Sequence, residues 1–341
     1  MLNWKRKTRN TVGNSVDDVR SYFGGIWFSK TLGAVLLIYL IIAVFVGWYW
    51  SQEPKLFSVT VNAEATAQAN QQKIVTGYTS VATVKHLMQT MLDKPGGYLT
   101  NDKFPPGLWL DNIPSWEQGV LVQVRNFSRA LVKDFTRAQS QSTEDTDLAA
   151  AYARFNSDPN RWMFPATEEE YRKGINYLNV YLKRMNTADG NAKFYTRADN
   201  LNNWLGDVSA SLGNVSQSLS ASVGRTNLVG QLEGDTEHIT KTPWLEIDNV
   251  FYEARGEAWA LLHLFKAVEV DFADVLAKKN ATESVRNIIR ELEATQHTVW
   301  SPIILNGDGY GILANHSLVL ANYISRANAT ILELRQLLSQ G

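Results

Sequence analysis

LNNWLGDVSASLGNVSQSL, residues 201–219, decides the fold class of this chain. Its large apolar side chains recur alternately every four and every three residues, at Leu201, Leu205, Val208, Leu212, Val215 and Leu219. This period places them on one face of an α-helix, and the alternation of fours and threes is typical of helices that pack nearly parallel or antiparallel. The stretch therefore predicts a helix with a heptad-type seam.

The same period recurs along most of the chain, in residues 81–91, 171–185, 285–299 and 320–338. Alternating strand patterns bounded by hairpin turns are nearly absent, which argues against a sheet. We therefore expect an all-α body, an elongated multi-helix bundle of about six to eight helices with heptad-type packing.

Residues 31–50, TLGAVLLIYLIIAVFVGWYW, contain no charged side chain. As a helix this run is about 30 Å long, the thickness of the hydrocarbon core of a bilayer. Aromatic residues flank it on both sides, as in the interfacial belts of membrane proteins. The alternative is a cleaved signal peptide, whose apolar core is usually about 7–15 residues. The longer run favours a retained transmembrane helix in contact with lipid.

Residues 1–30 carry six basic and two acidic side chains, a net charge of +4, whereas the rest of the chain carries −5. The positive-inside rule then predicts a cytoplasmic tail at 1–30 and a body on the far side of the membrane. An acidic body also argues against nucleic acid as a partner. Residues 51–72 are polar and rich in Ala, Gln and Asn, so we expect a linker or a fraying helix before a helical domain at 73–341.

Residues 93–116, DKPGGYLTNDKFPPGLWLDNIPSW, break the helical period and contain four of the nine prolines. Long segments of this kind are usually functional or disordered, and the aromatic side chains favour order. We expect either a structural strap over a bundle end or a binding loop.

A predicted helix after this loop carries basic residues every four positions, which would form one basic stripe. Like charges at this spacing repel, so an acidic group should offset them. That group is either internal, with Glu144, Asp145 and Asp147 close by in sequence, or an external anionic lipid, glycan or partner. The candidate ligand or partner surface comprises Trp109, Trp116, Arg125, Arg129, Lys133 and Arg137.

Several stretches resemble the bacterial family named domain of unknown function 2333. They are LDKPGGYLTND (92–102), PPG (105–107), LDN (110–112) and VLVQVRNFSRALVKDFTRAQSQSTEDTDL (120–148). The resemblance extends over nearly the whole chain. It implies a Gram-negative protein with one N-terminal membrane helix and a helical body, so the membrane would be the bacterial inner membrane and the body would lie in the periplasm. The resemblance supplies no catalytic residue.

Motifs for common chemistries are missing from the sequence. The chain has no cysteine, so disulfides, thiolate metal sites and thiol nucleophiles are excluded. Its five histidines are scattered, without H-E-x-x-H, and neither G-x-S-x-G nor S-x-x-K is present. We therefore expect no catalytic residue, no metal ligand and no cofactor. One exception stays open: Glu253 and Glu257, one helical turn apart, could act as acid and base if one were buried, although a solvated helix face is the simpler interpretation.

These observations favour a non-enzymatic, membrane-anchored envelope protein that acts as a scaffold, adaptor or assembly partner. Its partner would be another envelope protein or a second copy of the chain. A binding module for anionic lipid or cell-wall glycan is one alternative. An envelope hydrolase that uses paired carboxylates is the other.

Overall fold

The computed structural model describes residues 30–137, 143–187, 190–226, 239–301, 303–307 and 313–340, so most of the basic N-terminal tail lies outside it. The chain divides into two compact units, Met1–Trp50 and Ser51–Gly341. The first contains the helix Lys30–Trp50, which among the described residues is the one helix long and apolar enough to cross a membrane. Nearly all its large apolar side chains are exposed, as a lipid-facing helix requires.

The second unit is built from helices, which confirms the predicted all-α fold. The longer helices are α2 (Val59–Ala69), α3 (Tyr78–Asp93), α4 (Asn112–Ala130), α5 (Thr146–Phe155), α6 (Thr167–Met185), α7 (Ala198–Ser220), α8 (Ile247–Asp271), α9 (Ala273–Lys278), α10 (Thr282–Ala294) and α11 (His316–Ser339). Shorter turns are the 3-10 helices η1 (Gly107–Trp109), η3 (Ala221–Val223) and η4 (Trp244–Glu246) and the π-helix η2 (Leu131–Phe135). The strands β1 (Arg225–Thr226) and β2 (Ile239–Thr240) pair antiparallel.

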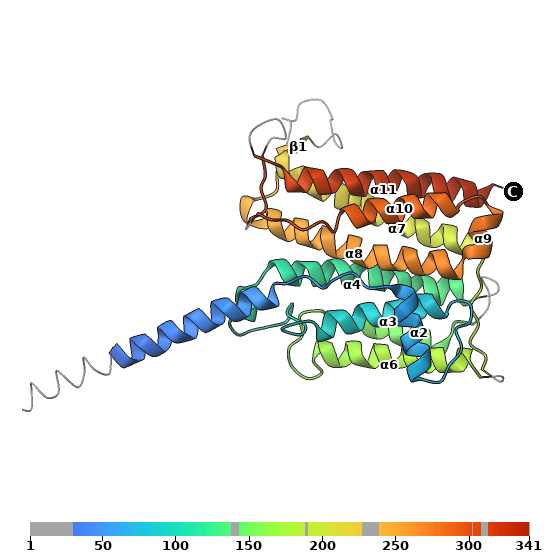
Figure 1. The fold of residues 1–341 in the computed structure, drawn as a ribbon, viewed down its shortest axis with the longest axis horizontal. Coiled ribbons are helices and arrows are strands. Elements are labelled where there is room, and N and C mark those ends of the chain that lie inside the picture. Colours follow the sequence, from blue (N-terminus) through green and yellow to red (C-terminus); the bar gives the residue numbers. More distant parts are fainter. Residues whose placement is uncertain are drawn as a thin grey trace, which may run out of the picture. The chain divides into compact units, whose positions relative to one another are not determined.

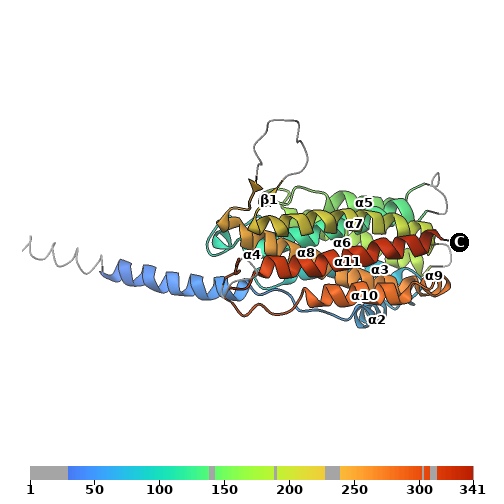
Figure 2. The same cartoon turned by 90° about the horizontal axis from the view of Figure 1, so that it is seen from above.

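Helices α4 and α8 form the centre of the bundle (Figure 1). On one side α8 contacts α7, α10 and α11, and on the other α3 and α4 pack with α5 and α6 (Figure 1). Figure 2 shows the same helices turned by 90°. The two central helices run parallel. The ring of Trp116, near the start of α4, lies 5.0 Å from that of Trp259 in the middle of α8. Further along both helices, the ring of Phe135 in η2 lies 5.3 Å from that of Phe272, which follows α8. Helix α8 contacts α2, α3, α4, α7, α10 and α11, so most of its residues are buried.

The backbones of α4 and α8 touch at two glycines. A Cβ atom on Gly119 would lie 2.0 Å from the carbonyl oxygen of Glu253, and one on Gly256 would lie 2.1 Å from that of Trp116. No side chain larger than hydrogen fits at either position without moving a helix. The pair therefore sets the distance between the two central helices.

The predicted seam of residues 201–219 packs against α11. Leu201, Leu205 and Leu212 of α7 are fully buried, as are Ile324 and Ile331 of α11. Both helices thus use side chains spaced by threes and fours to fill one shared core. This confirms the heptad-type packing expected for these two segments.

Of the two interpretations of segment 51–72, a linker or a fraying helix, the structure has a helix, because residues Val59–Ala69 form α2. Val59, Ala63 and Ala67 are buried, and the helix packs on α3. The Ser58 side chain accepts a hydrogen bond from the Val61 N–H and caps the helix start. Two of the three contact residues are alanine, so the pattern in the sequence lacks the large apolar side chains that mark a seam.

Two helix boundaries also differ from expectation. Helix α4 begins at Asn112, where the Asp111 side chain caps it, so the loop is shorter than 93–116 and Trp116 belongs to the helix. Helix α10 ends at Ala294 rather than continuing to residue 299. The carbonyls of Thr295 and His297 instead accept hydrogen bonds from the buried Arg255 side chain, at 3.0 and 2.9 Å.

Truncation of the α7–α11 seam should destabilise the body strongly. Leu212→Ala removes a fully buried side chain, and we expect a loss of about 2–5 kcal/mol in the free energy of unfolding. Leu332→Ala makes the same change at a position of α11 that is 51% exposed and should stay within about 0.5 kcal/mol of the parent. Denaturant unfolding in one detergent measures both, and equal small losses would mean that the seam is not packed.

Candidate functional site

Three of the four basic residues of the predicted stripe each contact a different partner in the structure. Arg125 donates to the carbonyls of Phe155 and Ser157 at 2.7 and 2.9 Å, which caps the C-terminal end of α5. Arg129 forms an ion pair with Asp207 of α7, and Lys133 forms one with Glu144.

The remaining candidates do not complete one open surface. Trp116 is fully buried against Trp259, whereas Trp109 in η1 is 53% exposed. Arg137 follows Thr136, the residue that ends η2. Of the three acids that were expected to offset the stripe, Glu144 contacts a stripe residue, and Asp145 and Asp147 do not.

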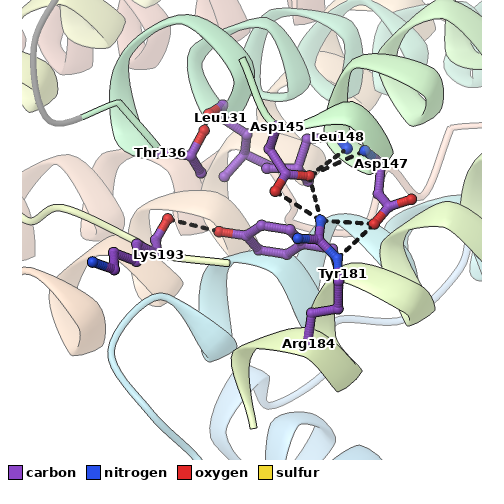
Figure 3. Close-up of polar contacts among 8 residues, drawn as sticks. All are labelled: Leu131, Thr136, Asp145, Asp147, Leu148, Tyr181, Arg184 and Lys193. Atoms are coloured by element: carbon purple, nitrogen blue, oxygen red, sulfur yellow. Dashed lines mark hydrogen bonds and ion pairs between the residues drawn. The ribbon is translucent and has the colours of Figure 1, made fainter. Parts of the chain in front are cut away.

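Asp145 and Asp147 bind Arg184 of α6 rather than the stripe (Figure 3). Asp145 also caps α5 by accepting hydrogen bonds from the N–H groups of Asp147 and Leu148 at 3.1 and 3.2 Å. Arg184 lies 2.7 Å from a carboxylate oxygen of each aspartate. The cluster joins the start of α5 to the end of α6 and has a structural role.

The family-like loop wraps a buried carboxylate. Glu117 of α4 is completely buried and lies 2.6 Å from Lys94 Nζ. Its oxygens also accept the backbone N–H groups of Leu99 and Thr100 and the Thr100 hydroxyl. Between these donors Gly96 has a φ of 84°, a conformation that glycine adopts readily. Residues 94–100, KPGGYLT, thus surround Glu117 with hydrogen-bond donors in the core. We call this segment the strap, and its contacts with Glu117 explain its unusual sequence.

A second buried carboxylate lines a cavity. Glu257 of α8 is 5% exposed, and its Oε2 accepts hydrogen bonds from Gln123 of α4 at 2.5 Å and from Ser211 of α7 at 2.7 Å. The cavity, about 260 Å³, is also lined by Glu253 and Asn214. The two glutamates that the sequence offered as an acid–base pair therefore share one site between three helices.

The protonation of this site follows from its burial. Burial raises the pKa of Glu257 to about 7; the hydrogen bonds from Ser211 and Gln123 oppose this shift, and the nearby Glu253 adds to it. Burial also raises the pKa of Glu253. Near neutral pH one carboxyl group can therefore hold or release a proton inside a small polar cavity, which is the requirement for general acid–base work or for proton-linked binding of a cation.

The sequence interpretation missed the partners of both buried glutamates. Glu117 and Gln123 lie on the face of α4 that also presents Ile113, Trp116 and Val120 to the core. A charged or amide side chain on the apolar face of an amphipathic helix signals a buried polar contact. The partners Lys94, Ser211 and Glu257 come from other segments and leave no local pattern.

Within the described parts of the chain, no group of three or more His, Asp or Glu side chains is arranged to hold a metal ion. The fold and site define a helical-bundle protein with one apolar N-terminal helix and buried carboxylates at its centre. The chain belongs to the family described as uncharacterized protein conserved in bacteria (DUF2333), which it matches over residues 22–341. Neither a curated protein nor a solved structure matches it.

The raised pKa of Glu257 predicts a specific pH dependence of stability. The folded state holds this proton more tightly than the unfolded state, whose glutamate has a pKa near 4.5. The unfolding free energy of the parent should therefore fall, relative to Glu257→Gln, as pH rises from about 4.5 to about 7, by up to about 3 kcal/mol, and stay constant above that.

Urea unfolding of both proteins across this pH range in one detergent measures the difference. Glu246→Gln, at an exposed position near the start of α8, is the matched control and should follow the parent at every pH. Parallel profiles for the parent and Glu257→Gln would show that Glu257 is not held protonated by the fold.

Proposed function

We propose that this protein is a membrane-anchored envelope protein of a Gram-negative bacterium, whose helical body acts as a scaffold or adaptor in the periplasm. The observation that carries the proposal is the pairing of one exposed apolar helix, Lys30–Trp50, with a large body of densely packed helices. The basic residues before the helix favour a cytoplasmic N-terminus and a periplasmic C-terminus.

Ion pairs within the chain support a binding or structural role for the body. Arg129, Lys133 and Arg184 are each engaged by an acid of the same chain, which leaves them little capacity for an external anion. A ligand surface built on the basic stripe is therefore a weaker proposal than a protein partner or a second copy of the chain. Crosslinking in native membranes, followed by mass spectrometry, would identify that partner.

The carboxylate cavity favours a second candidate, an envelope hydrolase. Glu253 and Glu257 line one cavity, and the pKa of Glu257 lies near 7, where a group works efficiently as both acid and base. The two donors on Glu257 Oε2 are equally explained as the solvation of a buried carboxyl group. The Glu257→Gln comparison tests the premise of this candidate, because a carboxyl group without a near-neutral pKa would lack the required chemistry.

A pair of fusions tests the anchor and its orientation. A reporter that is active only after export, fused after Gly341, should be active, and a reporter that folds only in the cytoplasm should be inactive there. An epitope placed before Met1 should stay attached to the body in the membrane fraction, because the anchor is retained. Loss of the epitope from the mature protein would identify the segment as a signal sequence, and an active cytoplasmic reporter would reverse the orientation.

A further inference from the structure

The exposed Phe and Trp side chains of the body gather in the connections that lead into α4, α6, α8 and α11. Among the described residues of the body they are Phe104, Trp109, Trp162, Phe164, Trp244 and Trp300. Phe164 is 94% exposed and Trp300 is 92% exposed. We call these six residues the aromatic end.

The four connections lie at the same end of the bundle (Figures 1 and 2). Asn101, in the loop before α4, donates a hydrogen bond to Glu168 in the first turn of α6. The ring of Phe251, in the second turn of α8, lies 6.4 Å from that of His316, where α11 begins. Because α4 and α8 run parallel, all four helix starts meet at one end. As far as it is described, the connection between α2 and α3 at the opposite end exposes Ile74 and Val75 and no Phe or Trp.

Packing of the bundle does not account for this exposure. Large aromatic side chains are usually at least half covered, and a contiguous exposed apolar region marks an interaction site. A basic residue precedes an aromatic by one to three positions in three of the connections: Lys103, Arg161 and Lys241. All three are exposed, and none forms an ion pair with a described residue. Asp111 and Glu246 lie nearby, so the apolar side chains rather than net charge distinguish this end.

The chain that follows the apolar helix is fixed to the body almost immediately. Glu53 forms a two-point ion pair with the buried Arg255, at 2.9 and 2.5 Å. The Phe57 N–H donates to His263 Nε2 at 3.1 Å, and the two rings stack 3.9 Å apart. Burial lowers the pKa of His263 to about 3, so this ring stays neutral and its Nε2 remains an acceptor. From Trp50 to Glu53 the chain reaches only about 10 Å.

We propose that the aromatic end inserts into the headgroup layer of the same bilayer that the N-terminal helix spans. Trp and Phe side chains beside Lys and Arg are the composition of protein segments that lie in the membrane interface. The short, fixed connection keeps the body within reach of that layer. The four connections come from separate parts of the chain and present their apolar side chains at one end, as a planar surface requires. The proposal rests on the membrane anchor proposed above.

Spin labels on single cysteines test this directly, because the chain has no cysteine of its own. The full-length protein is reconstituted in vesicles of phosphatidylethanolamine and phosphatidylglycerol, and each label is probed with oxygen, which concentrates in lipid, and with a water-soluble nickel chelate. The test positions are Phe164→Cys and Trp300→Cys, both so exposed that the change leaves the core intact. Val180→Cys and Leu332→Cys, 46% and 51% exposed on helix flanks, are matched controls, and Leu40→Cys reports on the anchor.

We expect labels at 164 and 300 to shift toward oxygen collision and away from the chelate, relative to 180 and 332, with the label at 40 deepest. If 40 is in lipid while 164 and 300 match the controls, the aromatic end does not dock on the bilayer and the anchor proposal stands. If 40 itself is in water, both proposals fail. Equal protection of 164, 300, 180 and 332 would overturn the assignment to this end, because the whole body would then be covered.

Discussion

The contact between the backbones of α4 and α8 at Gly119 and Gly256 is the constraint on which the body depends. At both positions a single methyl group would approach a carbonyl oxygen of the other helix to about half of the normal contact distance. The two helices can therefore approach this closely only because both positions are glycine. This close approach brings the Trp116 and Trp259 rings together and places Gln123 of α4 within 2.5 Å of Glu257 of α8.

Buried charges then attach the outer parts of the chain to this central pair. Glu117 of α4 holds the strap through Lys94 and two backbone N–H groups, and Arg255 of α8 holds the segment after the apolar helix through Glu53. A buried ion pair adds little net stability compared with apolar packing, but removal of one partner leaves an unpaired charge in the core and costs several kcal/mol. These pairs thus fix where each loop attaches, and they explain why the strap sequence is specific.

The sequence was sufficient for features that rest on local periodicity. Leu201 to Leu219 predicted a packed helix face, and the structure has it, because the period of apolar residues is a property of one segment. The partners of the basic stripe could not be predicted, because Asp207 and Glu144 lie outside the helix that carries the stripe. The pairing of Gln123 with Glu257 joins residues far apart in the chain, so only the tertiary fold reveals it. For helix α2 the sequence left a linker and a fraying helix open, because its buried alanines carry little apolar signal.

Two glycine-to-alanine substitutions test the central contact. The same chemical change should raise the free energy of unfolding at one position and lower it at the other. Alanine favours a helix over glycine by about 1 kcal/mol, so Gly213→Ala in α7, whose new Cβ atom would meet nothing closer than 3.9 Å, should stabilise the body by roughly 0.5–1 kcal/mol. Gly119→Ala brings the same gain in helix propensity, but its Cβ atom would lie 2.0 Å from the Glu253 carbonyl oxygen, so we expect a net loss of about 1–3 kcal/mol. The free energy of unfolding in denaturant measures both. A loss for Gly119→Ala beside a gain for Gly213→Ala is the result this account predicts, and a gain for both would contradict it.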